Sequence, residues 1–460
     1  MGLLKTYVLP HPPLIVKEVG NGSEEKVIKT IEAYKKVADE IANLKPNTII
    51  ISSPHAQIYN DYFHISPNSN ATGSFEQFGA KEVTFNETYD EELVREISQI
   101  AKERNFPAGT FGEKDPNLDH GTMVPLYFIE QKYKDFKLVR IGLSNLTEID
   151  HYQLGEIIKE AIDKTNRKVV YIASGDLSHR LQPDGPYGIT NEGIEYEKKI
   201  MDDLSNARFN NLFNYDEKLL KNAGICGHHS FIIMSGVLDG LNVEVETLSH
   251  EDITGVGYGI CTYTPKEENS LRRFRKIYLE NELKRLEEKY LKSDDYIKLA
   301  RNTIIEYIKT GNIIPVLEDI NSELINKKAG VFVSIHKFGK LRGCIGTIIP
   351  TRKNIATEII YNAISASTND NRFNPIEIDE LPYLDVKVDV LGPIEDIDSR
   401  EELNPKKYGV IVYTDNKRGL LLPDLNGIDT IEKQIEIAKR KANITFENYK
   451  LQRFEVIRHK

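Results

Sequence analysis

The fold of the first part of the chain is decided by the stretch Val169-Val170-Tyr171-Ile172-Ala173-Ser174-Gly175-Asp176-Leu177-Ser178-His179. Its first five residues form a short apolar run that ends at Ser174-Gly175, which is typical of a strand buried on both faces. The polar residues Asp176 and His179 follow directly after this strand. Open α/β sheets bind ligands beyond the carboxyl ends of their strands. The stretch therefore predicts a fold class and the edge of the sheet at which a functional site lies.

Three similar apolar runs precede this strand along the chain, at residues 6–9, 48–51 and 138–141. Between the first two lies a segment, about residues 24 to 43, whose apolar residues recur at helical spacing: Val27, Ile28, Ile31, Tyr34, Val37 and Ile41. Strands that alternate with helices predict an α/β domain, an open and mostly parallel sheet with helices on both faces.

Histidines follow three of the four predicted strands. His11 lies in the segment Pro10-His11-Pro12-Pro13, His55 ends the segment Ser52-Ser53-Pro54-His55, and His179 ends the stretch of residues 169–179. The prolines beside His11 and His55 restrict the backbone, which favours a fixed side-chain geometry. A single histidine at a strand end is more often a hydrogen-bonded structural residue than a ligand. Three histidines at equivalent strand ends favour a shared metal or catalytic site.

Two further segments offer groups for such a site. Asp119-His120 lies in a polar loop, and residues 224–229 read Gly-Ile-Cys-Gly-His-His, with Cys226, His228 and His229 as candidates. Imidazole nitrogen, thiolate sulfur and carboxylate oxygen bind mid-to-late first-row divalent metals. Two histidines and one anionic ligand would suit Fe(II), and zinc or copper would suit these donors at least as well. A small buried hydrophobic role for Cys226 remains the structural alternative.

The length of 460 residues predicts two or three domains. Near Pro265 the composition changes to a strongly charged stretch with a narrow apolar stripe, which predicts a connecting helix over residues 266–289. Mixed strand and helix patterns follow it. We therefore expect an α/β domain at residues 1–265 and a smaller α+β domain at residues 290–460.

Composition and charge exclude several classes of protein. The formal net charge of −10 argues against a general nucleic-acid-binding surface. No apolar run approaches the roughly 18 to 20 residues that a membrane span needs. The three cysteines are far apart and odd in number, which disfavours a disulfide framework and favours a cytoplasmic location.

The most distinctive motif of the second part is Gly339-Lys340-Leu341-Arg342-Gly343-Cys344-Ile345-Gly346-Thr347. The two glycines around Cys344 permit a close backbone approach or a tight turn, and a neighbouring Arg342 would favour a reactive thiolate. The alternative is a buried strand cysteine between small residues, with Arg342 pointing to solvent. A redox-active thiol protein that uses Cys344 is therefore one functional hypothesis for the chain.

The histidine-bearing segments resemble the LigB-type class III extradiol dioxygenases and the related MEMO family. The matching pieces are Pro10-His11-Pro12, Ser53-Pro54-His55, Asp119-His120-Gly121, Ser174-Gly175-Asp176-Leu177-Ser178-His179, Ile225-Cys226-Gly227 and Gly255-Val256-Gly257-Tyr258. The resemblance implies that His11 and His55 are metal ligands. It also implies that His179 is the acid/base residue, supported by Asp176, with His120 as a further catalytic candidate.

The third ligand departs from the pattern of the ring-cleaving enzymes. Those enzymes use a glutamate, whereas this chain offers Cys226, His228 and His229 after Gly224. Because MEMO-like members have a cysteine in this motif, the resemblance implies Cys226 as the ligand. A thiolate changes the charge and softness of the site and puts ring cleavage in question.

The second part resembles the AMMECR family, whose members are mixed α+β domains. The matching pieces are the motif of residues 339–347, Asp370-Asn371-Arg372-Phe373-Asn374-Pro375, Val386-Lys387-Val388-Asp389-Val390-Leu391, Tyr408-Gly409-Val410-Ile411-Val412 and Arg418-Gly419-Leu420-Leu421-Leu422-Pro423. The fusion resembles the arrangement of AmmeMemoRadiSam system proteins, which implies a radical S-adenosylmethionine protein as partner. The chain lacks the closely spaced cysteines of an iron–sulfur motif, so that partner would be a separate chain.

Two main hypotheses of function follow. The first is an iron-dependent, dioxygenase-like oxidoreductase that acts on a small aromatic or related substrate. The second is a non-catalytic metal- or ligand-binding module that serves a partner protein. Asp176 and His179 favour the first hypothesis, and the absence of a glutamate among the candidate third ligands favours the second.

Overall fold

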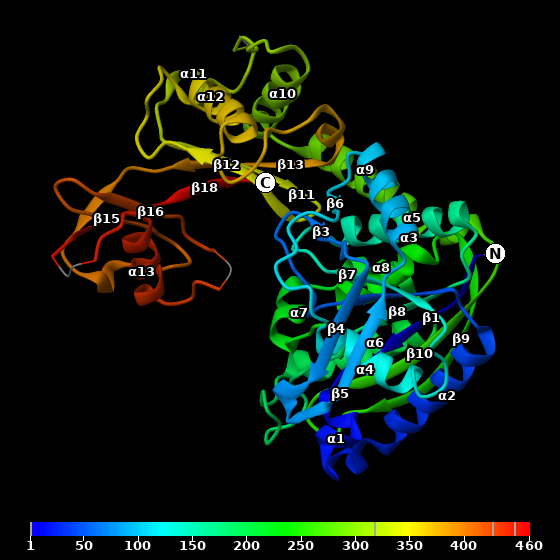
Figure 1. Cartoon of the computed structure of the whole chain (residues 1–460). Coiled ribbons are helices and arrows are strands. Elements are labelled where there is room, and N and C mark those ends of the chain that lie inside the picture. Colours follow the sequence, from blue (N-terminus) through cyan, green and yellow to red (C-terminus); the bar gives the residue numbers. More distant parts are fainter. Residues whose placement is uncertain (1, 317–318, 426, 446–447) are drawn as a thin grey trace. The chain divides into compact units, whose positions relative to one another are not determined.

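The structure is a computed structural model that describes residues 2–316, 319–425, 427–445 and 448–460. The chain divides into two compact units (Figure 1). Unit 1 ends at Leu279 and unit 2 begins at Glu280. The helix that lies in the region expected to connect the domains is α9, Phe274–Lys292. In the described part of the chain, no helix combines the length and the apolarity that crossing a bilayer requires.

Unit 1 is built on a six-stranded sheet with the strand order β7-β2-β8-β1-β10-β9. The strands are β1 Leu3–Leu9, β2 Thr48–Ser53, β7 Lys137–Gly142, β8 Val169–Ser174, β9 Leu241–Glu251 and β10 Tyr258–Glu268. Strands β7, β2, β8 and β1 run parallel, and β10 and β9 complete the sheet as antiparallel strands. The predicted mostly parallel sheet is thereby confirmed.

Helices cover both faces of this sheet because side chains alternate along each buried strand. Ile49 and Ile51 pack toward α2 (Ile28–Leu44) and α4 (His120–Ile129) on one face. Ile50, between them, packs with the helices of the other face: α3 Glu91–Glu103, α5 Glu148–Thr165, α6 Asn191–Ser205 and α8 His228–Val237. Figure 1 shows this layered arrangement. The shorter elements of unit 1 are α1 Lys17–Gly20, β3 Phe63–His64, β4 Asn70–Phe75, β5 Ala80–Thr88, β6 Ala108–Gly109 and α7 Glu217–Ala223.

Unit 2 contains two four-stranded antiparallel sheets, with the orders β12-β11-β13-β18 and β14-β17-β15-β16. The first sheet consists of β11 Val331–Lys337, β12 Lys340–Gly346, β13 Leu384–Leu391 and β18 Val456–His459. The second consists of β14 Glu395–Ile397, β15 Gly409–Tyr413, β16 Arg418–Leu421 and β17 Lys450–Phe454. The helices are α10 Asp295–Thr310, α11 Ser322–Asn326, α12 Ile355–Thr368 and α13 Ile431–Lys441. This mixture confirms the predicted α+β class of the smaller domain.

Strand β11 shows how one face of the first sheet of unit 2 is buried. Val331, Val333 and Ile335 belong to a core that also contains residues of α10 and α12. Ser334 and His336 alternate with them and therefore lie on the opposite face. That face lines a cleft within unit 2.

Candidate metal centre

The residues after β1, β2 and β8 meet because these strands are parallel and in register. Leu9 at the end of β1 pairs with Ser174 at the end of β8, and Ser52 near the end of β2 pairs with Ala173. Just beyond this edge, the backbone N–H of His11 donates a 2.8 Å hydrogen bond to Oδ1 of Asp176. This bond holds the loop after β1 to the loop after β8.

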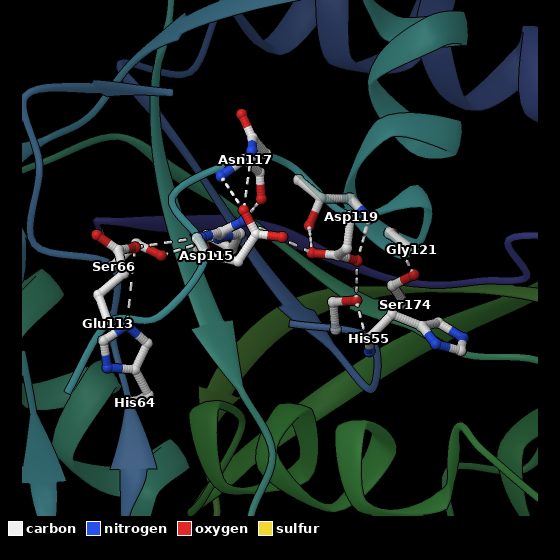
Figure 2. Close-up of polar contacts among 12 residues, drawn as sticks. His55, His64, Ser66, Glu113, Asp115, Asn117, Asp119, Gly121 and Ser174 are labelled. Carbon is white, nitrogen blue, oxygen red and sulfur yellow. Dashed lines mark hydrogen bonds and ion pairs between the residues drawn. The ribbon is translucent and has the colours of Figure 1, made fainter. Parts of the chain in front are cut away.

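The tautomer of His11 follows from its hydrogen bonds. Ser174 donates its hydroxyl proton to the carbonyl oxygen of Gly121 over 2.6 Å, a contact drawn in Figure 2. Nδ1 of His11 lies 2.8 Å from the same hydroxyl oxygen. Because the Ser174 proton is already used, Nδ1 must carry the proton that is shared with Ser174. The lone pair of His11 is therefore on Nε2, as in a metal-ligating histidine whose other nitrogen is hydrogen-bonded.

Two further donors converge on that lone pair. Nε2 of His55 lies 3.1 Å from Nε2 of His11, and Sγ of Cys226 lies 3.7 Å from it. The three donor atoms all lie within 4.8 Å of one another. A tetrahedral ion with the usual bond lengths to nitrogen and sulfur separates its ligands by about 3.3 Å (N–N) and about 3.6 Å (N–S). The observed spacing therefore fits one bound cation.

Cys226 is brought to the site by a close crossing of two backbone segments. A Cβ on Gly175 would overlap the Cα of Gly227, and a Cβ on Gly227 would lie 2.8 Å from the carbonyl oxygen of Asp176. The glycines thus allow the start of α8 to approach the end of β8, where the N–H of Asp176 donates to Sγ of Cys226 over 3.2 Å. Burial, and next the Asp176 carboxylate, hold the pKa of Cys226 well above its usual value. A bound cation is what would favour the thiolate here.

Asp176 and His179 lie on the other side of Cys226. Nε2 of His179 is 3.9 Å from Oδ2 of Asp176, and it is buried without a hydrogen-bond partner among the described residues. The ring of His179 stacks on Tyr187 with a centroid separation of 5.3 Å. Burial lowers the pKa of His179 to about 4 and raises the pKa of Asp176 to about 7. His179 is therefore a neutral imidazole at pH 7 that can accept a proton.

His120 also lies at this edge, on the first turn of α4. Its ring centroid is 3.9 Å from that of His55 and 5.4 Å from that of His11. Asp119 caps the helix by accepting from the N–H of Thr122, and it accepts a 2.5 Å hydrogen bond from Oγ of Ser53. Burial, with His55 second, lowers the pKa of His120 to about 4. Figure 2 shows Asp119 between Asn117 and Gly121, above His55.

Arg140 of β7 supports the loop that carries Asp119, and sequence reasoning did not single it out. This buried guanidinium donates to Oγ of Ser66 over 2.8 Å, to the carbonyl oxygen of Asn117, to the carbonyl oxygen of Asp115 over 3.2 Å, and to Glu113 over 3.3 Å. Figure 2 labels these partners, Ser66, Glu113, Asp115 and Asn117. The sequence feature that could have indicated this role is the presence of an arginine inside the apolar run at residues 138–141.

The structure does not bring His228 and His229 to the centre. His228 is buried in the helical layer, where Nε2 lies 3.1 Å from the carbonyl oxygen of Leu212 and Nδ1 lies 3.2 Å from the Tyr196 hydroxyl. His229 stacks on His151 at 4.1 Å and lies 3.4 Å from Glu148. Among the described residues, Cys226 is the one candidate from residues 224–229 that joins His11 and His55 in a cluster able to hold a metal ion.

Arg342 and Cys344 lie in unit 2. The guanidinium of Arg342 binds Glu380 through two hydrogen bonds of 3.0 and 2.8 Å. Arg342 also donates to the carbonyl oxygens of Asn374 and Pro375. Cys344 instead faces the cleft of unit 2, with Sγ 3.2 Å from Oγ of Ser334. Arg342 therefore pairs with Glu380, which the motif around Cys344 did not indicate.

The open α/β sheet carries converging His, Cys and Asp side chains at one edge, and this cluster could hold a metal ion. The family model described as the catalytic LigB subunit of aromatic ring-opening dioxygenase matches residues 5–261, and the AMMECR1 model matches residues 297–459. The chain belongs to the LigB family and joins a LigB domain to an AMMECR1 domain.

Relatives share the fusion or one of its parts. A Clostridium acetobutylicum protein, CA_C1420, is 42% identical over 471 residues and covers 100% of both chains. A Thermotoga maritima protein is 48% identical over 168 residues, which is 36% of this chain and 97% of that protein. Among solved structures, Pyrococcus horikoshii PH0010 has a TM-score of 0.34 at 31% identity, covering 36% of this chain and 89% of that one.

Proposed function

We propose that unit 1 is a metal-dependent, LigB-type oxidoreductase that binds Fe(II) through His11, His55 and Cys226. The observation that supports this most strongly is the tautomer of His11, which directs the Nε2 lone pair toward the other two donors. Zinc or copper would also fit the same nitrogen and sulfur atoms. The proposed substrate is a small aromatic or related molecule.

A bound Fe(II) would supply a Lewis acid and a place for oxygen at this edge of the sheet. The side chains of the protein would handle the protons. His179 is neutral at pH 7 and its Nε2 has no partner among the described residues, so it can accept a proton from a phenol-type hydroxyl and return it later. Asp176, with its pKa near 7, lies 3.9 Å away and would stabilise the protonated imidazole.

We also propose that the oxidoreductase works with a radical S-adenosylmethionine protein, which would be a separate chain. A second candidate function is a non-catalytic metal- or ligand-binding module that serves a partner protein. The specific observation in its favour is the Cys226 thiol at the third ligand position. A thiolate adds charge to the site and alters its preference among metals. Both functions require the same metal ligands and differ in their requirement for His179.

Metal content of protein purified without oxygen is the first test. We expect about one iron per chain in the wild type and its loss in the His11→Ala/His55→Ala double variant, because both nitrogen donors are removed. His179→Gln is the matched control, since it changes a neighbouring imidazole that is not a proposed ligand, and it should retain the metal. No metal in the wild type, even after addition of Fe(II), would refute both functions.

Oxygen consumption with a panel of catechols then separates the two functions. The oxidoreductase requires oxygen uptake by the metal-loaded wild type and a large loss in His179→Gln at unchanged metal content. A general base contributes about 10² to 10⁴ in rate, so the loss should be of that order. Metal-loaded protein that takes up no oxygen with any catechol would favour the non-catalytic module.

A further inference from the structure

Unit 2 contains a cleft of about 720 Å³ between its two sheets and α13. The first sheet contributes the face of β11, β12, β13 and β18 that is opposite its apolar core. Gly343 of β12 packs on the other face, where a Cβ would overlap the backbone of Ala366 in α12. Its neighbour Cys344 therefore points the other way, into the cleft.

The charge of the cleft contrasts with that of the whole chain. Its lining includes five cationic side chains and only two carboxylates, Asp389 and Asp424, although the chain has a net charge of −10. Cations gathered in a concave, partly apolar wall focus a positive potential on the space in front of them. The cationic residues are Arg372, Lys387, Lys441, Arg458 and Lys460.

Three of the five cations make no ion pair with a carboxylate among the described residues. Arg372 is paired with Asp370 at 2.6 Å, and Arg458 is paired with Asp389 at 2.8 Å. The structure shows no ion pair for the other three, Lys387, Lys441 and Lys460, within the residues that it describes. A cation that has no carboxylate partner is stabilised when an anion binds beside it.

Further features of the lining point to the same kind of ligand. The pKa of Lys441 is lowered, first by desolvation, with the Arg372 guanidinium adding to this and the Cys344 thiol opposing it. Nδ1 of His336 is buried in the wall without a hydrogen-bond partner among the described residues. The apolar side chains of Phe332, Leu420 and Leu422 complete the lining. The cleft has the size and mixed character of a small-molecule site.

We propose that this cleft binds a small molecule through an anionic group, a phosphate or a carboxylate, which is held by Lys387 and Lys441 beside Cys344. The N–H of Cys344 donates to Asp370 over 2.9 Å, and Arg372 donates to the Cys344 carbonyl oxygen over 3.1 Å. These contacts fix the strand at Cys344 while its thiol remains on the cleft face. The site lies in the AMMECR1 domain and does not depend on the metal centre of unit 1.

Cys344 provides a built-in reporter of the potential in the cleft. The test compares the alkylation rates of Cys344 by anionic iodoacetate and neutral iodoacetamide in the full chain, at fixed pH and low ionic strength, with products mapped by peptide mass spectrometry. Relative to N-acetylcysteinamide, we expect the iodoacetate-to-iodoacetamide ratio at Cys344 to be raised roughly threefold or more, because the cleft attracts the anion. A ratio equal to or below that of the free thiol would overturn the proposal.

Variants of α13 identify the source of the effect. Lys441→Gln should reduce the iodoacetate-to-iodoacetamide ratio toward the free-thiol value. Lys441→Arg keeps the positive charge and should therefore give the wild-type ratio. Lys433→Gln is the matched control, because Lys433 is an exposed lysine on the same helix outside the cleft. Thermal unfolding of each variant checks that the fold is retained. Equal ratios in Lys441→Gln, Lys433→Gln and the wild type would contradict the proposal.

Occupancy is tested with inorganic phosphate and with citrate at constant ionic strength. A bound anion should slow alkylation of Cys344 by the neutral iodoacetamide, and the effect should be lost in the Lys387→Gln/Lys441→Gln double variant. Protection by phosphate alone assigns a phosphate group, protection by citrate alone assigns a carboxylate, and protection by both assigns a general anion site. Protection by neither would overturn the proposal.

Discussion

At the scale of single residues, Ser174 determines which nitrogen of His11 carries the lone pair. Its hydroxyl accepts from Nδ1 of His11 while it donates to Gly121. Without the hydroxyl, the imidazole can adopt either tautomer or rotate. The orientation of the proposed ligand therefore depends on a residue that does not itself bind the metal.

Replacement of Ser174 tests this dependence. We expect Ser174→Ala to lower the metal affinity by about 10- to 100-fold, as is typical when the hydrogen-bond partner of a ligating histidine is lost. The affinity is measured by competition with a chromogenic chelator. Ser235→Ala is the matched control, because Ser235 is a buried serine that donates to a carbonyl of its own helix. Similar affinities in the two variants would show that Ser174 has no such role.

Glu380 illustrates a residue whose charge stabilises unit 2. Burial opposes its ionisation, but hydrogen bonds from Arg342 and the nearby Lys337 lower its pKa to about 2. A free glutamate has a pKa of about 4.3. Since the folded pKa is the lower one, the stabilisation is present above about pH 4.3 and is lost as the pH falls toward 2.

The variant Glu380→Gln should therefore be less stable than the wild type at pH 7, by about 1 to 3 kcal/mol. The difference should shrink as the pH falls from about 4.3 toward 2. Urea unfolding of the full chain, followed by hydrogen exchange of unit 2 peptides, measures both values. Asp379→Asn, an exposed change in the same turn, is the control. A difference that stays constant with pH would contradict the assignment.

Sequence reasoning reached the proposed ligands but could not foresee their supporting contacts. His11, His55 and His179 could be predicted as site residues because the carboxyl ends of parallel strands meet at one edge of the sheet. Arg342 and Cys344 show what a local sequence motif cannot predict. The register of β11 and β12 shifts so that Ile335 pairs with Gly343 and His336 pairs with Leu341, which leaves Arg342 as the extra residue of a bulge. A bulge redirects a side chain, and pairing between strands is not visible in a local motif.

At the scale of elements, β7 and the loop of residues 113–119 form one supporting unit. Arg140 projects from the strand and binds two carbonyl oxygens of this loop as well as Glu113. The loop leads into α4, whose first turn carries His120. The position of His120 is therefore determined by a strand at the edge of the sheet.

Removal of this guanidinium should lower the stability of the protein and leave the metal content unchanged. We expect Arg140→Met to lower the free energy of unfolding by about 3 to 5 kcal/mol, because Glu113 and the carbonyl oxygens lose a buried partner. Metal content should persist, since the proposed ligands lie on other segments. Urea unfolding and iron analysis measure these effects. In contrast, Arg104→Met removes a surface pair with Glu160 and should change stability by no more than about 0.5 kcal/mol.

The hairpin of β9 and β10 is an element that the strand pattern did not predict. Strand β9 lies at the edge of the sheet and pairs only with β10, so much of it is exposed and polar. Its sequence lacks the continuous apolar run that marks β1, β2 and β8. The hairpin joins the sheet through β10, which pairs with β1 between residues far apart in the chain, such as Cys261 with Val8. Local periodicity contains no information on such pairing.

At the scale of the whole molecule, the candidate metal centre and the proposed anion cleft lie in different compact units. Hydrogen exchange of the full chain with and without Fe(II), under nitrogen, measures the effect of metal on each unit. We expect added protection in peptides that contain His11, His55 and Cys226, because a ligand stabilises the state that binds it. Peptides from residues 297–459 should exchange at unchanged rates. Equal protection in both units would show that metal binding is coupled to unit 2.

The order in which the three donors leave the ribosome has a consequence for how the centre matures. His11 and His55 are 44 residues apart, whereas Cys226 follows His11 by 215 residues. At about 5 to 20 residues per second, translation separates the first histidine from the cysteine by roughly 10 to 40 seconds. A nascent chain thus exposes two imidazoles long before the thiol arrives. Selection of a metal by the proposed ligands would therefore be a late event, governed by the ion that is available when the Cys226 segment docks beside the parallel strands β1, β2, β7 and β8.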